Sequence, residues 1–323
     1  MDTTWDGLPI APDWPRGATV VVRRADGAVL LLHRAHHGAD YAGPWGWTAP
    51  SGSRQPGEAI LPGAIRELAE EAGLHGINLE PVDLTGSWAL FVASAPLDAP
   101  VALGDVEHDR FEWVRPGDAY DRVKPRFTAD GLRRALAVLS SRISFAALER
   151  ADLADVVTWQ NASHVRPWWP DAVEGLAAAE AKYGPRIDGA SPTTVDVISL
   201  ADRSIGFIEC TPLAADEEYH DVAQWATDGG ADAVSIDYAI GDASVVGHGV
   251  GTRVIWHYIR EVVLARYPGT RYLVADPSVA NVASIRACEK AGFRRAHDFE
   301  SEPDGGRFAL CVFDRARVLG DLA

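Results

Sequence analysis

The chain has 323 residues, 47% of them hydrophobic and 24% charged, and a formal net charge of -16 at pH 7. This length and composition describe a globular protein with room for two domains, each with its own core. The acidic balance argues against nucleic-acid or anionic-membrane partners and favours a cationic small molecule, although a plain solvated acidic surface would give the same charge. Because no run reaches the ~18 apolar residues of a membrane span and no signal-peptide pattern opens the chain, we expect a cytoplasmic protein.

The cysteines Cys210, Cys288 and Cys311 are odd in number and lack the spacing of a zinc site. We therefore expect reduced thiols, with neither a disulfide framework nor a structural zinc ion. The sequence carries no signal for a particular oligomeric state.

The first predicted elements are two strands, residues 18–23 and 29–33, whose connection Asp26-Gly27 is a common hairpin turn. A helix is then predicted from Pro62 to Gly73, since proline fits the first helical position and glycine the C-terminal cap. Several glutamates occupy this helix.

Glu67, Glu70 and Glu71 stand at i, i+3 and i+4 of the predicted helix, so their carboxylates share one face. Like charges held this close repel one another, and a bound cation would relieve that repulsion. Carboxylate oxygens are the ligands that Mg²⁺ prefers. The alternative is a solvated acidic helix face, which leaves the positions of Gly52 and Glu58 unexplained.

The stretch from Gly52 to Leu74, GSRQPGEAILPGAIRELAEEAGL, resembles the Nudix box at every defined position. The resemblance implies a Nudix α/β/α sandwich that hydrolyses a nucleoside diphosphate derivative with Mg²⁺ or Mn²⁺. It implies that Glu58 and Arg66 orient the loop and the helix. It also implies a metal site of Gly52, Glu67, Glu70 and Glu71, in which Glu70 is catalytic. One departure is Ser51, where the family commonly has a second glycine.

Residues 107–113, EHDRFEW, resemble a stretch of some Nudix hydrolases, including those that cut diadenosine tetraphosphate. In those enzymes the first glutamate approaches the metal, so the resemblance makes Glu107 an additional ligand or a catalytic base. An exposed carboxylate at the end of a strand is the alternative for Glu107 and stays open.

A helix at residues 128–140 closes this half, and a new strand at 143–148 follows at once. We therefore place the boundary near Ser141 and predict two domains, 1–141 and 142–323. Farther on, the pattern predicts a helix, a loop and a two-stranded hairpin at residues 153–163, 181–194 and 194–210.

Residues 235–240, SIDYAI, alternate as a strand does, and the turn 246–252, VGHGVGT, opens a helix with apolar residues at helical spacing. A glycine turn that leads into a helix can cradle a phosphate, because backbone N–H groups reach the ligand and the positive helix end favours an anion. The same glycines also suit a plain flexible turn. A second apolar strand at 272–275 and a helix at 281–291 follow.

Three stretches resemble the GNAT acetyltransferases, and more narrowly the aminoglycoside 6′-N-acetyltransferases: SIDYAIGDASVVGHGVGTR, ADPSVANVASIRACEKAGF and WQNASHVRPWW. The resemblance spans about residues 143–318. It implies a mixed, mostly antiparallel sheet flanked by helices, and acetyl-CoA-dependent acetylation of an aminoglycoside 6′-amine, an antibiotic-resistance activity. The residues implied in acetyl-CoA binding are Val246, Gly247, His248, Gly249, Val250, Gly251, Thr252 and Asn281.

In this family a carboxylate near the acceptor is the proposed base, and the resemblance places Asp237 there, with Asp276 as a second acid. Both are implied to be catalytic and to pair with the ammonium groups of the substrate. Cys288 stands where GNAT enzymes commonly carry the tyrosine that protonates the leaving thiolate, so it is the implied, weaker acid. The tryptophans implied to cover the sugar rings are Trp168, Trp169 and Trp225.

Several alternatives stay open. Asp237 could be a strand aspartate satisfied by local amides, and the Trp168-Trp169 pair could belong to the core. The acceptor could be a siderophore hydroxylamine or a lysine derivative. The Nudix half could be a nucleotide-sensing or dimerising module, against which its intact glutamates argue.

Overall fold

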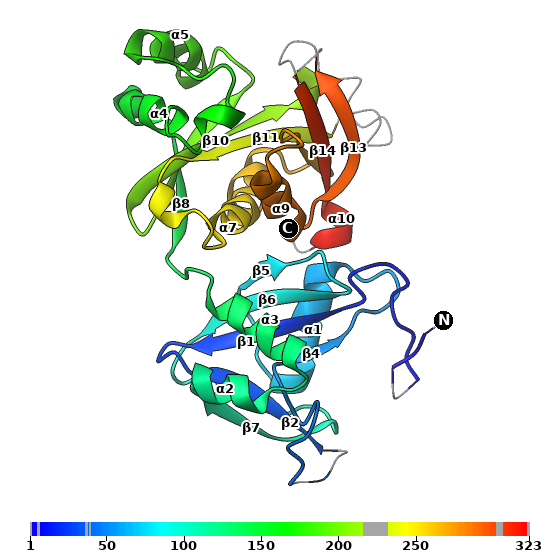
Figure 1. The fold of residues 1–323 in the computed structure, drawn as a ribbon. Coiled ribbons are helices and arrows are strands. Elements are labelled where there is room, and N and C mark those ends of the chain that lie inside the picture. The colour runs from blue at the N-terminus through cyan, green and yellow to red at the C-terminus, as the bar shows by residue number, and fades with distance from the viewer. Residues whose placement is uncertain are drawn as a thin grey trace. The chain divides into compact units, whose positions relative to one another are not determined.

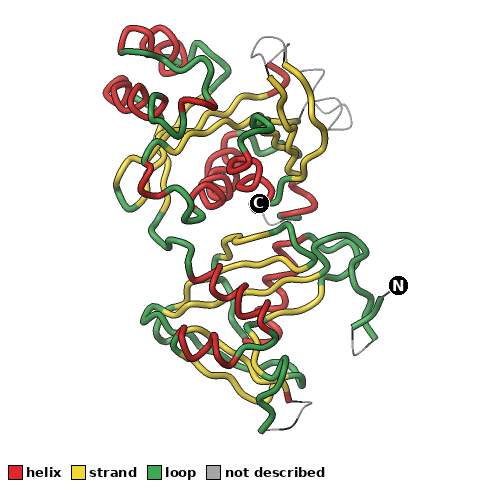
Figure 2. The backbone as a smooth tube through the Cα atoms, in the orientation of Figure 1, coloured by secondary structure: helices red, strands yellow, loops and turns green. Residues whose placement is uncertain are grey.

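The computed structural model describes the whole chain except residues 1, 5, 6, 36, 37, 39, 216–231, 302–305, 322 and 323. It forms two compact units, one of Met1–Leu139 with Ala316–Ala323 and the other of Ser140–Arg315. Each unit holds one β-sheet with helices packed on it (Figure 1, Figure 2), so the predicted two-domain α/β fold class is confirmed. In the described part of the chain, no helix has both the length and the apolar character needed to cross a membrane.

The sheet of the first unit has the strand order β3-β2-β1-β6-β5, with β4 beside β1 and β7 beside β2. Of the strands that the structure describes here, only β1 and β6 pair in parallel. The buried, β-branched and leucine-rich β1 and β2 confirm the first two predicted strands. The strands are β1 (Gly17–Arg24), β2 (Val29–Arg34), β3 (Trp47–Thr48), β4 (Ser51–Ser53), β5 (Leu79–Asp83), β6 (Trp88–Ala95) and β7 (His108–Val114).

Helices cover both faces of this sheet. Helix α1 (Ile60–Ala72) lies on one side, and α3 (Arg126–Leu136) lies on the other (Figure 1). The short α2 (Pro116–Arg122) packs beside α3. As predicted, α1 stops at Gly73, whose left-handed φ of 65° lets its N–H bond back to the carbonyl of Ala69. The α/β/α layering expected of this half is therefore present.

The sheet of the second unit has the order β13-β14-β12-β11-β10-β9-β8. Among the described strands, only β11 and β12 run parallel, so the sheet is mixed and mostly antiparallel, as predicted. The strands are β8 (Ile143–Ala147), β9 (Thr194–Leu200), β10 (Arg203–Pro212), β11 (Ala233–Ile240), β12 (Tyr272–Ala275), β13 (Arg294–Ser301) and β14 (Gly306–Asp314).

Two helix pairs flank this sheet. On one face, α4 and α5 share a buried cluster with Phe207 and Ala239. On the other face, α7 and α9 pack together, and Figure 1 shows them away from α4 and α5. The helices of this unit are α4 (Leu153–Gln160), α5 (Leu176–Ile187), α7 (Val250–His257), α8 (Leu264–Arg266) and α9 (Val282–Lys290). The short α10 (Arg315–Val318) belongs, from Ala316 onwards, to the first unit.

The loop predicted at residues 181–194 is wrong in its first part, because α5 continues to Ile187. Gly184 and Pro185 suggest a break in the helix, yet Pro185 lies inside α5 close to its C-terminal end. Burial compensates for the poor local propensity, since the Tyr183 ring is 0% exposed and lies edge-on to Phe207 at 6.2 Å between ring centroids.

Candidate active sites

Helix α1 buries Glu71 against the neighbouring strand β4. Glu71 is 4% exposed, and its Oε2 accepts a hydrogen bond of 2.7 Å from the backbone N–H of Ser51. Because the donor is main chain, the departure from glycine at Ser51 leaves this contact intact. Burial raises the pKa of Glu71 well above its usual value, and repulsion from Glu67 and Asp105 adds to the shift.

Arg66 organises the other carboxylates of the predicted metal site. Its Nε and Nη2 donate to the two carboxylate oxygens of Glu58 at 2.8 and 2.9 Å, and its Nη1 donates to Glu67 and Glu70 at 2.8 Å each. Burial raises the pKa of Glu67 to about 7. A Cβ atom on Gly52 would overlap the Glu67 carboxylate, so glycine leaves the space that this carboxylate occupies.

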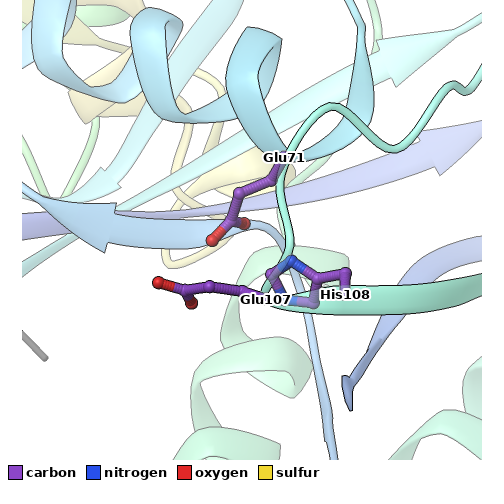
Figure 3. Close-up of side chains that lie close together, drawn as sticks. All are labelled: Glu71, Glu107 and His108. Atoms are coloured by element: carbon purple, nitrogen blue, oxygen red, sulfur yellow. The ribbon is translucent and has the colours of Figure 1, made fainter. Parts of the chain in front are cut away.

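A second cluster joins the C-terminal end of α1 to the start of β7. One carboxylate oxygen each of Glu71 and Glu107 and one ring nitrogen of His108 lie within 4.8 Å of one another. Figure 3 shows the two carboxylates and the imidazole close together, with Glu71 descending from α1 and the other two side chains coming from the start of β7. Glu107 also accepts a hydrogen bond from Arg34 Nη1 at 3.1 Å.

His108 is the site residue that sequence reasoning missed. It is 4% exposed, its Nδ1 lies 3.1 Å from Asp105 Oδ1, and its Nε2 is buried without a hydrogen-bond partner among the described residues. The sequence signal that could have identified His108 is its position directly after Glu107 in the EHDRFEW stretch. Two carboxylates and an imidazole form a donor set that fits a divalent cation.

In the second unit, Asp237 of β11 lies near other acidic side chains. The register places Glu209 of β10 directly opposite Asp237, and Arg186 of α5 donates to Glu209 Oε2 at 2.6 Å. Glu209 is 8% exposed, and its Oε1 has no partner among the described residues. Glu209 was also missed, because pairing between two strands cannot be read from either strand alone.

The carboxyl of Asp237 has an unusually high pKa although the side chain is exposed to solvent. The largest cause is that surrounding protein atoms remove water from the carboxyl group. Repulsion from Asp276 and Glu209 raises the pKa further, whereas Arg186 lowers it. Asp276 is half-buried directly after the end of β12. The structure therefore brings both predicted acids to one place.

The predicted glycine turn has the backbone that its sequence requires. Gly247 and Gly249 have left-handed φ angles of 85° and 77°, and Gly249 is the N-terminal cap of α7. Val246 is 47% exposed. Asn281 caps α9, its Oδ1 accepting from the Ser284 N–H at 3.2 Å. An exposed turn at a helix N-terminus is suited to an anionic phosphate.

Next to this turn, β11 parts from β12. The parallel ladder between these strands runs from Ala233 to Ser235 on β11, although β11 continues to Ile240. Within the described residues, Ile236–Ile240 of β11 do not pair with β12, and this part of the strand leads towards the N-terminal end of α7. An extended ligand can pair with such a strand edge.

Two family models match the chain. One is described as a NUDIX domain and covers residues 13–136, and the other is described as an acetyltransferase (GNAT) domain and covers residues 149–301. The chain joins a NUDIX domain to a GNAT acetyltransferase domain. Both resemblances inferred from the sequence motifs are thereby confirmed, and the chain carries two domains of enzyme families.

Two relatives in sequence agree with this assignment. The chain is 29% identical over 157 residues to the aminoglycoside N(6')-acetyltransferase type 1 of Klebsiella pneumoniae, covering 48% of this chain and 74% of that protein. It is 30% identical over 118 residues to the uncharacterized Nudix hydrolase orf19 of Rhodococcus erythropolis, covering 32% of this chain and 64% of that protein. A solved structure of AAC(6')-Ib with ribostamycin and coenzyme A is 27% identical, with coverages of 54% and 94% and a TM-score of 0.47.

The NUDIX domain contains a cavity of about 980 Å³ that is open to solvent. Its wall includes the carboxylates of Glu67, Glu70, Glu71 and Glu107 as well as exposed aromatic side chains. Trp45 and Phe127 form an edge-on pair at 5.6 Å between ring centroids, and Trp88 is 40% exposed. The cavity thus combines a negatively charged part with aromatic faces on which a planar ring can stack.

The tryptophans predicted for the GNAT domain lie in different environments. Trp168 is 40% exposed, whereas Trp169 is half-buried and lies edge-on to Phe207 at 5.1 Å between ring centroids. Trp169 therefore packs on the core, which agrees with the alternative that the Trp168-Trp169 pair belongs to the core. Trp225 lies outside the described residues.

Cys288 lies on α9, and Tyr238 lies on β11. Cys288 is 0% exposed, and burial raises the pKa of its thiol well above the usual value. The Tyr238 hydroxyl accepts from Ser284 Oγ at 3.4 Å and would lie 3.5 Å from a Cβ atom placed on Gly251. Tyr238 thus brings a phenol to the first turns of both α7 and α9.

Proposed function

We propose that the GNAT domain acetylates the 6′-amine of an aminoglycoside with acetyl-CoA. The observation that carries the proposal is the group of Asp237, Glu209 and Asp276 on and beside the strand that leads into the glycine turn. Carboxylates favour a cationic amine acceptor, and the turn at the N-terminus of α7 favours the pyrophosphate of the coenzyme. The similarity to an aminoglycoside N(6')-acetyltransferase supports this acceptor class.

In the proposed reaction, the amine nitrogen bonds to the acetyl carbon while the carbon–sulfur bond breaks. Asp237 accepts the proton that the amine loses, and Asp276 pairs with the charge of the acceptor. The leaving thiolate takes up a proton. Tyr238 is a better-placed donor than Cys288, because Tyr238 is only half-buried whereas the thiol has no exposed surface.

The acceptor is tested by thiol release from acetyl-CoA with kanamycin-like compounds that carry either a 6′-amine or a 6′-hydroxyl. We expect turnover of the amine alone, because a hydroxyl is a weaker nucleophile and offers no charge to Asp276. Siderophore hydroxylamines and lysine derivatives complete the panel. Equal turnover of the two aminoglycosides, or turnover restricted to the other acceptors, would refute the assignment.

We propose that the NUDIX domain hydrolyses a nucleoside diphosphate derivative with Mg²⁺ or Mn²⁺. The carboxylates of Glu67, Glu70, Glu71 and Glu107 in the wall of one cavity carry this proposal, and the nearby aromatic side chains suit a nucleobase. A bound cation would supply charge neutralisation at the diphosphate and activation of the attacking water. The cluster residues would hold it, while Arg66 keeps Glu67 and Glu70 in place.

A nucleotide panel with and without metal tests this proposal, with phosphate release as the measurement. Glu71→Gln should lower kcat by about 10²-fold or more, because the site loses an anionic ligand. Glu112→Gln is the matched control, since Glu112 pairs with Arg122 and stands outside the cluster. If no compound of the panel releases phosphate, the nucleotide-sensing or dimerising alternative replaces the hydrolase proposal.

A further inference from the structure

The cluster of Glu71, Glu107 and His108 has a feature that an oxygen-only metal site lacks. Its imidazole is almost fully buried, and one of its nitrogens makes no hydrogen bond with any described residue. A buried polar atom without a partner is costly, so native structures rarely keep one without a reason. Here the atom belongs to a ring that lies within ligand-sharing distance of two carboxylate oxygens.

The other ring nitrogen fixes the orientation of His108. Asp105 Oδ1 lies 3.1 Å from Nδ1, and this carboxylate also accepts hydrogen bonds from the backbone N–H groups of Glu107 and His108 at 2.9 and 3.1 Å. An imidazole that donates from Nδ1 to a carboxylate presents a lone pair at Nε2. Metal-binding histidines usually have such a carboxylate behind them, which orients the ring and strengthens the donor.

His33 shows that burial alone does not produce this arrangement. It is 0% exposed and lies on β2, the strand that pairs with β7. Both of its nitrogens have partners, Asp109 Oδ1 at 2.7 Å and the carbonyl of Tyr41 at 2.8 Å. Among the described residues of the NUDIX domain, His33 and His108 are buried. Both ring nitrogens of His33 have partners, whereas His108 has one unpartnered nitrogen and lies beside two carboxylates.

We propose that His108 Nε2 directly coordinates the divalent cation of the NUDIX domain together with Glu71 and Glu107. The proposal rests on the proposed hydrolase function for the presence of that cation. Imidazole nitrogen is a good ligand for first-row transition metals, whereas Mg²⁺ prefers oxygen ligands and retains its waters. The site therefore selects a transition-metal dication such as Mn²⁺ over Mg²⁺.

The test uses the tag-free full chain loaded with less than one equivalent of Mn²⁺. Electron spin echo envelope modulation detects a directly bound imidazole through its ¹⁴N coupling. We expect this coupling in the wild type and in the control variant His33→Gln, and its loss in His108→Gln. Calorimetric titration should show the Mn²⁺ affinity of His108→Gln reduced by about 10-fold or more, with a smaller change for Mg²⁺.

If His108→Gln does not fold, wild-type protein with ¹⁵N-labelled histidine is measured instead. A histidine bound to Mn²⁺ must then give ¹⁵N coupling in place of ¹⁴N coupling. Absence of nitrogen coupling in the wild type, or its persistence in folded His108→Gln, would overturn the proposal. Phosphate release measured on the same samples separates the two claims. Hydrolysis without nitrogen coupling would refute the ligand, whereas nitrogen coupling without hydrolysis would refute the hydrolase function.

Discussion

Asp237 and Tyr238 follow one another on β11, and adjacent strand residues point to opposite faces of a sheet. Asp237 shares its face with Glu209, its partner on β10, and with the Arg186 guanidinium of α5 that pairs with Glu209. Tyr238 reaches the other face, where its hydroxyl meets Ser284. A single strand thus supplies a carboxylate to the proposed acceptor side and a phenol to the proposed coenzyme side.

This arrangement predicts the acidic limb of the pH profile of acetyl transfer. Asp237 must be ionised to accept a proton, and its pKa is raised, so kcat should fall as pH decreases through that raised pKa. Asp237→Asn should lower kcat by ~10²–10⁴-fold and remove the limb. The measurement is thiol release over a pH series with saturating acetyl-CoA and aminoglycoside.

Glu209→Gln is the informative companion variant. Many surrounding atoms contribute to the desolvation of Asp237, and no single substitution removes that cause of its raised pKa. Repulsion from Glu209 is a cause that one substitution does remove. Loss of Glu209 also releases Arg186 to act on Asp237, and both effects lower the pKa of Asp237. The acidic limb should therefore move to lower pH in Glu209→Gln. A limb that stays in place in both variants would exclude Asp237 as the base.

At the scale of helices and strands, local periodicity was informative wherever one face of an element is buried. It predicted α1 with its glycine stop, the strands β1, β2, β11 and β12, and the helix after the glycine turn. It was wrong in α5, where Gly184 and Pro185 resemble a loop. There, packing of Tyr183 against Phe207 outweighs local propensity, and a sequence pattern does not contain that long-range contact.

The same limit applies to the metal site. Helical spacing correctly places Glu67, Glu70 and Glu71 on neighbouring positions of one helix. It does not say that Arg66 pairs with Glu67 and Glu70 while Glu71 turns towards β7. That division depends on where β7 pairs in the sheet, because the pairing brings His108 and its neighbour Glu107 to the end of α1. Helical spacing alone therefore predicts an acidic face but not its partners.

At the scale of the whole molecule, each unit contains its own candidate site. The carboxylate clusters, the aromatic side chains and the cavity belong to residues of the first unit, whereas the acidic group and the glycine turn belong to the second. No side chain is shared between the two candidate sites within the described part of the chain. The two proposed chemistries should therefore be separable by substitution.

Gly249 provides the sharpest test of this independence. Gly249→Asp places a carboxylate at the N-terminal cap of α7, where it should repel the coenzyme pyrophosphate and abolish CoA binding. Gly249→Asn is the matched control, because asparagine and aspartate tolerate the left-handed φ of 77° similarly but asparagine carries no charge. Calorimetry with CoA should show a much larger loss for Gly249→Asp than for Gly249→Asn, while metal-dependent nucleotide hydrolysis stays at the wild-type rate in both. Equal losses of CoA binding would assign the effect to backbone strain, and loss of hydrolysis in a folded Gly249→Asp protein would show that the two sites are coupled.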